Sequence, residues 1–185
     1  MRNRTLLLAA AIIALVLMPV LAGSPDAIEA ATVTVTSLGD TGAGTLRQAI
    51  TDANPGDTID FSVTGTITLS SGRLTVLDNL TLTGPGASSL TVSGNNSSGV
   101  FLTAIGTVAI SGLTLTNGNG GGGQGGGVEN QGTLTLTDVV VSNSVARLGS
   151  GIFNGGTFTL TRTTVSGNTD SQQGAASLLT AARRT

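Results

Sequence analysis

The sequence predicts an all-β solenoid, a parallel β-helix in which successive coils of the chain stack on one another. One unit occurs twice in succession, at residues 126–142 and 150–166, and apolar residues alternate with hydroxyl residues inside each copy. Equivalent positions such as Leu136 and Leu160 stand 24 residues apart. A fixed period of this kind is typical of solenoids, whose repeats share one core because none can bury its apolar face alone.

The apolar positions change parity partway through each copy. Leu134 and Leu136 occupy alternate positions of one strand, so their side chains should lie on the same face. After Asp138 the apolar residues are Val139 and Val141, and the chain must turn a corner there if both pairs face one core. The second copy repeats the switch with Phe158, Leu160, Arg162 and Val165, and a looser earlier copy does so with Val108, Ile110, Leu113 and Leu115.

Stacked coils would place like residues over like. Parallel strands pair at about 4.8 Å, so Asn130 should lie over Asn154, and Asp138 beside Arg162. The asparagine amides could then bond along the stack, as they do in cross-β assemblies; the alternative is two unrelated turn asparagines. The charged residues predict an exposed ion pair between adjacent coils, which explains both without catalysis.

The first segment, residues 1–22, is typical of a secretory signal peptide. A basic start with Arg2 and Arg4 precedes an apolar run and a small-residue cleavage site, and a second cleavage site could lie as late as residue 30. The alternative is an uncleaved anchor, because the run Leu6–Ala22 is at the short limit for spanning a bilayer. Either way we expect an exported chain, located at the cell surface or outside the cell.

Residues 32–61 predict an N-terminal strand followed by a short capping helix. Thr32–Thr36 alternates as a strand does, and Thr45 is a suitable N-cap for a helix over Leu46–Ala53. Apolar residues in that helix recur at i, i+3, i+4 and i+7, which gives it an apolar stripe. We expect the stripe to cover the open end of the solenoid core, which would otherwise meet water.

Residues 62–170 predict the β-helix coils. Short strands before the repeats are expected at Thr66–Leu69, Leu74–Leu77, Leu80–Thr83, Leu90–Val92 and Val100–Thr103, separated in several places by glycine-containing turns. Gly118–Gly127 holds eight glycines in ten residues and should form a flexible loop that bulges from one corner. Gly118–Gly123 matches a dinucleotide-binding pattern formally, but it has neither the βαβ context nor the acidic residue of such a site.

Short motifs in this chain resemble those of a known group of exported bacterial proteins. Gly44–Ile50 and Asn54–Phe61 resemble the N-terminal segment of right-handed parallel β-helix repeat proteins with the pectin-lyase-like fold. Gly126–Asn130 and Gly151–Asn154 are similar to motifs of polymorphic outer-membrane proteins, a family of β-helical adhesins. The resemblance covers about residues 32–170, and it implies a right-handed helix and a surface role.

The final segment, residues 171–185, departs from the repeat. Where a third copy should begin with Gly-Gly-Ile-Phe, the sequence has Ala175–Leu178. A one-base shift of codons for the expected residues gives Ala-Ala-Ser and a codon that can encode Leu. We therefore expect residues 175–185 to be an out-of-frame or truncated tail, a hypothesis that the shifted frame of the gene decides. It would leave the last coil uncapped, with a strand edge open to end-to-end self-association.

Composition excludes several classes of function. The chain has 185 residues, enough for one domain, with 10% charged residues and a net charge of −2. All eight basic residues are Arg, and this charge balance gives no basic footprint for nucleic acid. There is no Cys, His, Trp or Tyr, so disulfides are excluded. We assign no catalytic, cofactor-binding or metal-binding residue and no cofactor.

The resemblance to pectin-lyase-like proteins raises an alternative, a polysaccharide lyase or hydrolase fragment. Such enzymes need Arg or Lys beside Ca²⁺-binding acids, or several Asp residues around the scissile bond. Asp57 and Asp60 are the closest acidic pair, but Asp57 suits a turn role and Asp60 falls in a short strand. The four aromatic residues that could stack on sugars are Phe61, Phe101, Phe153 and Phe158, of which Phe158 has a core register.

The sequence therefore favours an exported structural or adhesive β-helix module of a cell-surface or secreted protein. Whether it is an enzyme stays open, although we expect binding rather than catalysis. The expected partners are a surface polysaccharide or a host or cell-surface ligand, with no nucleic acid and no membrane span in the mature chain. A non-functional fragment is a third interpretation, suggested by the tail.

Overall fold

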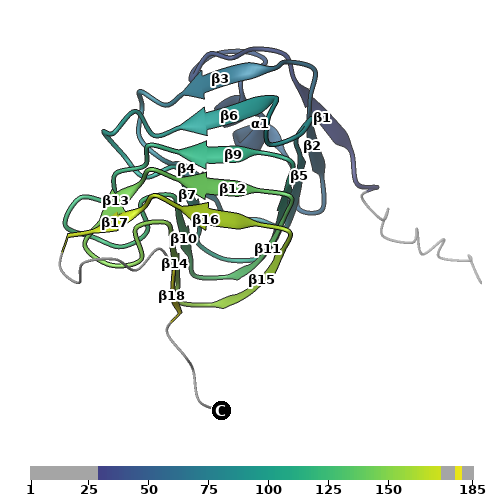
Figure 1. Ribbon diagram of the computed structural model, residues 1–185. Coiled ribbons are helices and arrows are strands. Elements are labelled where there is room, and N and C mark those ends of the chain that lie inside the picture. Colours follow the sequence, from purple (N-terminus) through teal and green to yellow (C-terminus); the bar gives the residue numbers. More distant parts are fainter. Residues whose placement is uncertain (1–28, 172–177, 181–185) are drawn as a thin grey trace, which may run out of the picture.

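The computed structural model describes residues 29–171 and 178–180, and these form a parallel β-solenoid of about six turns (Figure 1). In this part of the chain, neighbouring strands of each sheet pair parallel and in register. The predicted all-β solenoid is therefore confirmed. The predicted signal peptide and much of the predicted tail lie outside the described residues.

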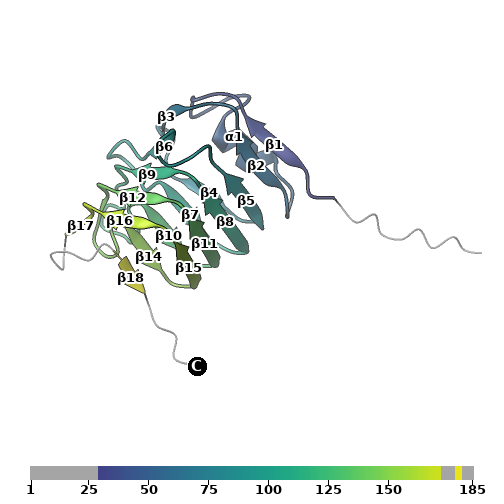
Figure 2. The same cartoon turned by 45° about the vertical axis from the view of Figure 1, so that its right-hand side comes forward.

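Three sheets form the walls of the solenoid, each with one strand per coil (Figures 1 and 2). Sheet A contains β1 (Thr32–Val35), β2 (Thr58–Phe61), β5 (Leu80–Thr83), β8 (Thr107–Ser111), β11 (Thr133–Thr137) and β15 (Thr157–Thr161). Sheet B contains β3 (Gly65–Thr68), β6 (Leu90–Ser93), β9 (Thr114–Thr116), β12 (Val140–Ser142) and β16 (Thr164–Ser166). Sheet C contains β4 (Leu74–Val76), β7 (Phe101–Thr103), β10 (Val128–Asn130), β14 (Ile152–Asn154) and β18 (Leu178–Thr180).

The core follows the predicted register. Leu134 pairs with Phe158 and Leu136 with Leu160 in the parallel ladder between β11 and β15. Leu134 and Leu136 are fully buried, while Phe158 and Leu160 are half-buried and pack against the same core cluster. These side chains therefore face one shared interior, which the apolar alternation of the sequence predicts.

The predicted corner between sheets A and B is made by left-handed backbone. Gly112, Asp138 and Arg162 occupy equivalent positions in three coils, with φ of 61°, 54° and 46°. A residue in the left-handed region changes the direction of the strand, so the side chains that follow point to the other side of the backbone. This explains why the apolar residues switch from even to odd positions there. Glycine adopts such a φ without cost and Asp tolerates it, whereas Arg adopts it only under constraint from the surrounding coil.

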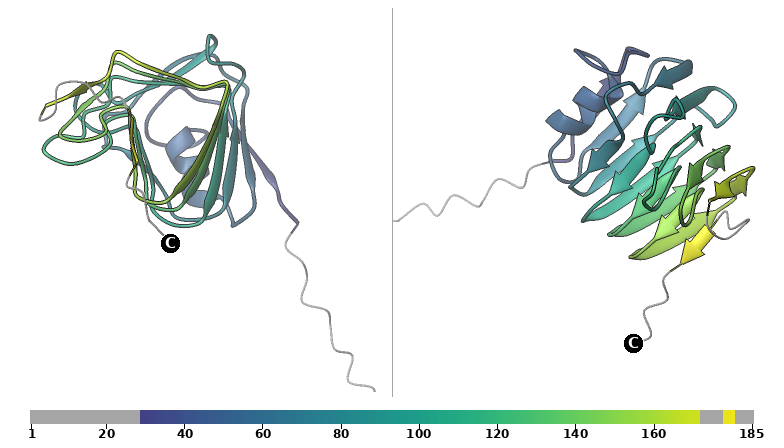
Figure 3. Two further views of the ribbon diagram at one scale, coloured as in Figure 1. Left: turned by 60° about the horizontal axis from the view of Figure 1, so that its bottom comes forward. Right: turned by 90° about the vertical axis from the view of Figure 1, so that its left-hand side faces the viewer.

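The helix α1 (Leu46–Asp52) lies within the outline of the coils when the solenoid is viewed end-on (Figure 3). The Thr45 hydroxyl accepts a hydrogen bond from the Gln48 N–H at 3.3 Å, as an N-cap does. Leu46 and Ala49 are buried and belong to the solenoid core cluster. The helix thus buries its apolar stripe against the first coils.

The glycine-rich segment 118–127 projects from the solenoid beside a small sheet of β13 (Val145–Ala146) and β17 (Thr169–Asp170) (Figure 1). Isolated bridges from Asn119 to Val145 and from Gln124 to Leu148 tie it to the next coil. A Cβ on Gly118 would collide with the carbonyl oxygen of Gly126. Close approach of the backbone therefore requires glycine here, a reason that the sequence interpretation did not consider.

Part of the predicted tail continues sheet C. β18 pairs with β14 in register, with Leu178 opposite Ile152. This strand occupies the place that a next coil would take in sheet C. The reading-frame hypothesis for residues 175–185 stays a prediction that only the gene sequence can decide.

Candidate functional site

Asp57 and Asp60, the acidic pair considered as candidate catalytic residues, have different structural roles. Asp57 is buried, and its carboxylate accepts hydrogen bonds from the N–H groups of Ala31 at 2.7 Å and Asn54 at 2.8 Å. These two donors, that of Ala31 first, lower the pKa of Asp57 below its usual value. An ionised carboxylate that is fully engaged by backbone N–H groups serves to hold the turn, as the Pro-Gly-Asp sequence indicates.

Asp60 lies on the outer face of sheet A, away from the core. It pairs in register with Thr34 on one side and Thr83 on the other. The residue is half-buried, and its Oδ1 atom is buried without a hydrogen-bond partner in the part of the chain that the structure describes. Asp60 therefore does not share the turn-forming role of Asp57. Its carboxylate lies in a row of hydroxyl side chains.

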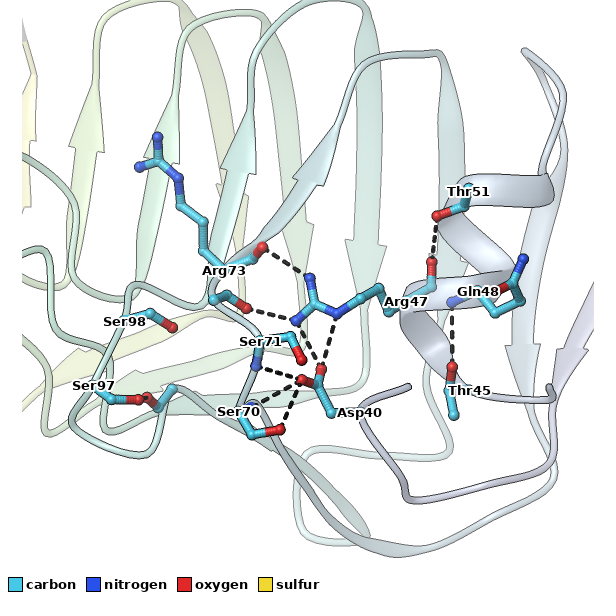
Figure 4. Close-up of polar contacts among 12 residues, drawn as sticks. Asp40, Thr45, Arg47, Gln48, Thr51, Ser70, Ser71, Arg73, Ser97 and Ser98 are labelled. Atoms are coloured by element: carbon cyan, nitrogen blue, oxygen red, sulfur yellow. Dashed lines mark hydrogen bonds and ion pairs between the residues drawn. The ribbon is translucent and has the colours of Figure 1, made fainter. Parts of the chain in front are cut away.

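An unpredicted polar cluster joins Asp40, Arg47 and the turn between β3 and β4 (Figure 4). The carboxylate of Asp40 accepts hydrogen bonds from Arg47 Nη2 at 2.7 Å and from the N–H groups of Ser70 at 2.9 Å and Ser71 at 2.7 Å. Arg47 also donates to the carbonyl oxygens of Gly72 at 2.6 Å and Arg73 at 3.1 Å. We call these residues the Asp40 clasp, because they fasten α1 to the first complete coil.

The electrostatics of the clasp favour the ionised carboxylate. Burial raises the pKa of Asp40, but the N–H of Ser70, the Arg47 guanidinium and the N–H of Ser71 together outweigh it. The result is a pKa lowered from 3.8 to about 2. At neutral pH the carboxylate is therefore ionised and accepts these hydrogen bonds.

A second ion pair spans three coils on the outside of sheet C. Arg73 Nη1 donates to Glu129 Oε2 at 2.6 Å, and Gln131 Nε2 donates to Glu129 Oε1 at 3.1 Å. Figure 4 shows the Arg73 guanidinium pointing away from the clasp, while its carbonyl oxygen faces Arg47. The arginine stem passes beside Gly99, which has no side chain to obstruct it.

The predicted ion pair between adjacent coils is confirmed. Arg162 Nε and Nη2 donate to the two carboxylate oxygens of Asp138, each at 2.6 Å. The bond to Arg162 lowers the pKa of Asp138, and that to Asp138 raises the pKa of Arg162. Both side chains are more than half exposed, at 67% for Arg162 and 51% for Asp138, so the pair explains the two residues without catalysis.

The predicted asparagine ladder is also confirmed. Asn130 Nδ2 donates to Asn154 Oδ1 at 2.5 Å and to the carbonyl oxygen of Thr157 at 3.0 Å. Its own Oδ1 accepts from the N–H of Gly132 at 3.2 Å. The two asparagines are 0% and 1% exposed, so their amides satisfy backbone groups in the dry interior of a corner.

The phenylalanines are unsuited to bind a sugar. Phe101 and Phe153 are buried, and Phe61 and Phe158 are half-buried against the core. Sugar-binding grooves usually stack rings on exposed aromatic faces, and these four do not offer one.

A groove of about 450 Å³ follows the corner between sheets C and A. It is lined by Ile105, Gln131, Thr133 and Thr157 and by glycines of successive coils, namely Gly106, Gly132, Gly155 and Gly156. None of these lining residues titrates, so the groove offers shape and hydrogen bonds rather than acid–base chemistry.

The threonines of sheet A form the most regular polar feature on the surface. Thr81 of β5, Thr135 of β11 and Thr159 of β15 belong to one outward row, and Thr83, Thr137 and Thr161 belong to a second. These outward positions alternate with the buried leucines of the core. The alternation of apolar and hydroxyl residues in the sequence predicts outward rows of threonine, and the register of these strands confirms them.

Within residues 29–171 and 178–180, no cluster of three or more His, Cys, Asp or Glu side chains could hold a metal ion. In the same residues, no helix has the length and apolar character needed to cross a membrane. No protein-family model, curated protein or solved structure matches the chain.

Proposed function

We propose that this chain is a structural or adhesive module of a secreted or cell-surface protein, which acts by binding rather than by catalysis. The observation that carries the proposal is the state of the carboxylates. The carboxylates of Asp40 and Asp57 accept hydrogen bonds from backbone N–H groups and that of Asp138 pairs with Arg162, so these three acids hold the fold together. What the solenoid offers a partner is its long, regular outer faces.

We also propose a relationship to two groups of β-helix proteins, on the basis of short sequence motifs. The motifs at residues 44–61 and 126–154 resemble those of pectin-lyase-like β-helix proteins and of polymorphic outer-membrane adhesins. A parallel solenoid is compatible with both. We propose export through the segment 1–22 and a surface polysaccharide or cell-surface ligand as partner.

Incubation of the purified chain with a panel of polysaccharides, with and without Ca²⁺, tests the proposal against the enzyme alternative. We expect retention on a ligand or cell surface with no change in the polymer. New reducing ends or unsaturated uronates would contradict the binding role. An Asp60→Asn variant is the matched control, because loss of such products in it would assign the activity to this chain rather than to a contaminant.

Export needs its own experiment. Expression of the full chain in a bacterial host, followed by N-terminal sequencing of protein recovered outside the cytoplasm, would locate the cleavage. Processing after residue 22 or residue 30 is the expected result. Retention of the unprocessed chain in the cytoplasm would contradict the surface assignment.

A further inference from the structure

We propose that the outer face of sheet A binds ice, by ordering water over a two-dimensional array of threonines. The inference goes beyond the proposed function, because ice is a different partner from the polysaccharide or cell-surface ligand proposed there. It starts from the pairing register, which aligns outward threonines from all six strands of the sheet.

The array has three rows that run along the solenoid axis. The first row contains Thr32, Thr58, Thr81, Ala109, Thr135 and Thr159. The second contains Thr34, Asp60, Thr83, Ser111, Thr137 and Thr161. A third, shorter row contains Thr107, Thr133 and Thr157. Only Ala109, Ser111 and Asp60 interrupt the threonines.

The spacing of the rows follows from β geometry. Neighbouring strands lie about 4.8 Å apart, and alternate residues of one strand about 6.7 Å apart. These perpendicular repeats are close to those of oxygen atoms on the prism face of hexagonal ice. Sheets usually twist by about 20–25° per strand, which would destroy such a match, but the later coils, drawn green to yellow, closely overlie one another in the end-on view (Figure 3).

The side chains are suited to hold water in fixed positions. Threonine is β-branched, so few χ1 rotamers are open to it in a strand, and its hydroxyl and methyl groups are held in place before any partner arrives. Thr81, Thr83 and Thr159 are exposed, and Thr135 and Thr137 are half-buried by their neighbours in the rows. Hydroxyls can anchor bridging waters while the methyl groups between them order the rest.

The chemistry of the face favours ice over a polysaccharide. Asp60 is the one charged residue in the three rows, and none of their residues is aromatic. A sugar polymer would call for stacking platforms and directed polar groups, whereas an ice surface needs repeated neutral groups. The other faces lack this pattern, since sheet C presents Thr75, Leu102, Glu129 and Phe153 in its outward row.

Sheet B supplies a matched comparison inside the same molecule. One outward row is open there, with Thr66, Thr91, Thr114, Val140 and Thr164. In the neighbouring row Ser93 and Thr116 are buried. A single open row repeats in one direction only, so sheet B should not bind ice.

The test is partition of the full chain into slowly grown ice, with thermal hysteresis and inhibition of ice recrystallisation as further measurements. The double variant Thr81→Lys with Thr135→Lys should lose most of its partition into ice. The double variant Thr66→Lys with Thr164→Lys adds the same charge on sheet B and should keep it. Circular dichroism and thermal unfolding of both variants establish that each is folded.

A gain-of-function variant keeps the proposal testable even if the lysines unfold sheet A. Ala109→Thr completes the first row, so it should raise both partition and hysteresis above those of the natural chain. Exclusion of the natural chain from ice, equal loss in both double variants, or no gain in Ala109→Thr would overturn the inference.

Parallel assays on insoluble polysaccharide separate this inference from the broader function. Retention on polysaccharide that the sheet A lysines abolish, without partition into ice, would overturn ice binding and support the adhesive role. Partition into ice without polysaccharide binding would support the inference. Turnover of the polymer would contradict the binding function itself.

Discussion

The asparagine ladder gives a test of the solenoid interior, through the substitution Asn130→Asp. The amide of Asn130 donates to Asn154 Oδ1 and to the carbonyl oxygen of Thr157, and its side chain is fully buried. An ionised aspartate has no proton to donate, so it would turn a negative charge toward two acceptors. Loss of these bonds and burial of an unpaired charge should cost about 3–5 kcal/mol of unfolding free energy at neutral pH.

The cost should depend on pH in one direction. Burial beside acceptors raises the pKa of the introduced carboxyl above its unfolded value of about 3.9. A group with a raised folded pKa contributes its stability below the unfolded pKa and loses it as pH rises through the folded pKa. At about pH 3.5 the protonated group can donate one hydrogen bond, and the difference from the natural chain should shrink to roughly 1–2 kcal/mol.

Denaturant unfolding followed by circular dichroism, at low and at neutral pH, measures this difference. Asn95→Asp is the matched control, since Asn95 is exposed and has a φ of 56° that Asp tolerates. The control should be nearly neutral at both pH values. A destabilisation of Asn130→Asp that did not change with pH, or none at all, would refute the ladder as a buried donor–acceptor chain.

Three further predictions concern the core and the ion pairs. Leu136→Ala empties a fully buried site and should cost about 2–5 kcal/mol by denaturant unfolding, whereas Leu77→Ala, at a position 55% exposed, should cost far less. Asp40→Asn should destabilise the chain at neutral pH. Because the pKa of Asp40 is lowered from 3.8 to about 2, its contribution is present above pH 3.8 and lost as pH falls toward 2, which stability measured against pH will show. Asp138→Asn removes the charge of an exposed ion pair but keeps a residue that tolerates the left-handed φ of 54°, so it should leave the midpoint of thermal unfolding almost unchanged.

The sequence predicted those features that repeat at the coil period. Asp138 with Arg162, and Asn130 with Asn154, are each separated by one coil, so the spacing of the residues indicated their contact. The buried face of sheet A followed from alternation in the same way. In each case both partners are side chains at equivalent positions of adjacent repeats, so the sequence alone identifies them.

The Asp40 clasp could not be predicted by this route, because its main donors are backbone groups. The N–H groups of Ser70 and Ser71 lie 30 and 31 residues from Asp40, and any non-proline residue would supply them. Arg73 and Glu129 are 56 residues apart and reach across an intervening coil. A pairing rule for adjacent coils does not find such a contact.

The alignment of the threonine rows on sheet A also could not be predicted from the repeat length alone, because the coils differ in length. Coil length changes from 26 to 24 residues between the steps Leu136 to Ile110 and Leu136 to Leu160, yet β8, β11 and β15 each keep five residues in register. The difference falls in the connection from sheet B to sheet C, which spans residues 117–127 in one coil and 143–151 in the next.

Length also varies in the connection from sheet A to sheet B, which spans residues 84–89 in one coil and 112–113 in the next, so in both places the extra residues lie outside the strands of sheet A. A one-residue slip in any of its strands would turn threonines inward and leucines outward, whereas extra residues in the projecting loops leave every row aligned. The core requires only that alternate residues be apolar, and threonine suits the outward positions of any exposed strand, as the row Thr66, Thr91, Thr114 and Thr164 on sheet B shows. What distinguishes sheet A is that several such rows lie side by side in register, and it is this two-dimensional repeat that a periodic partner would require.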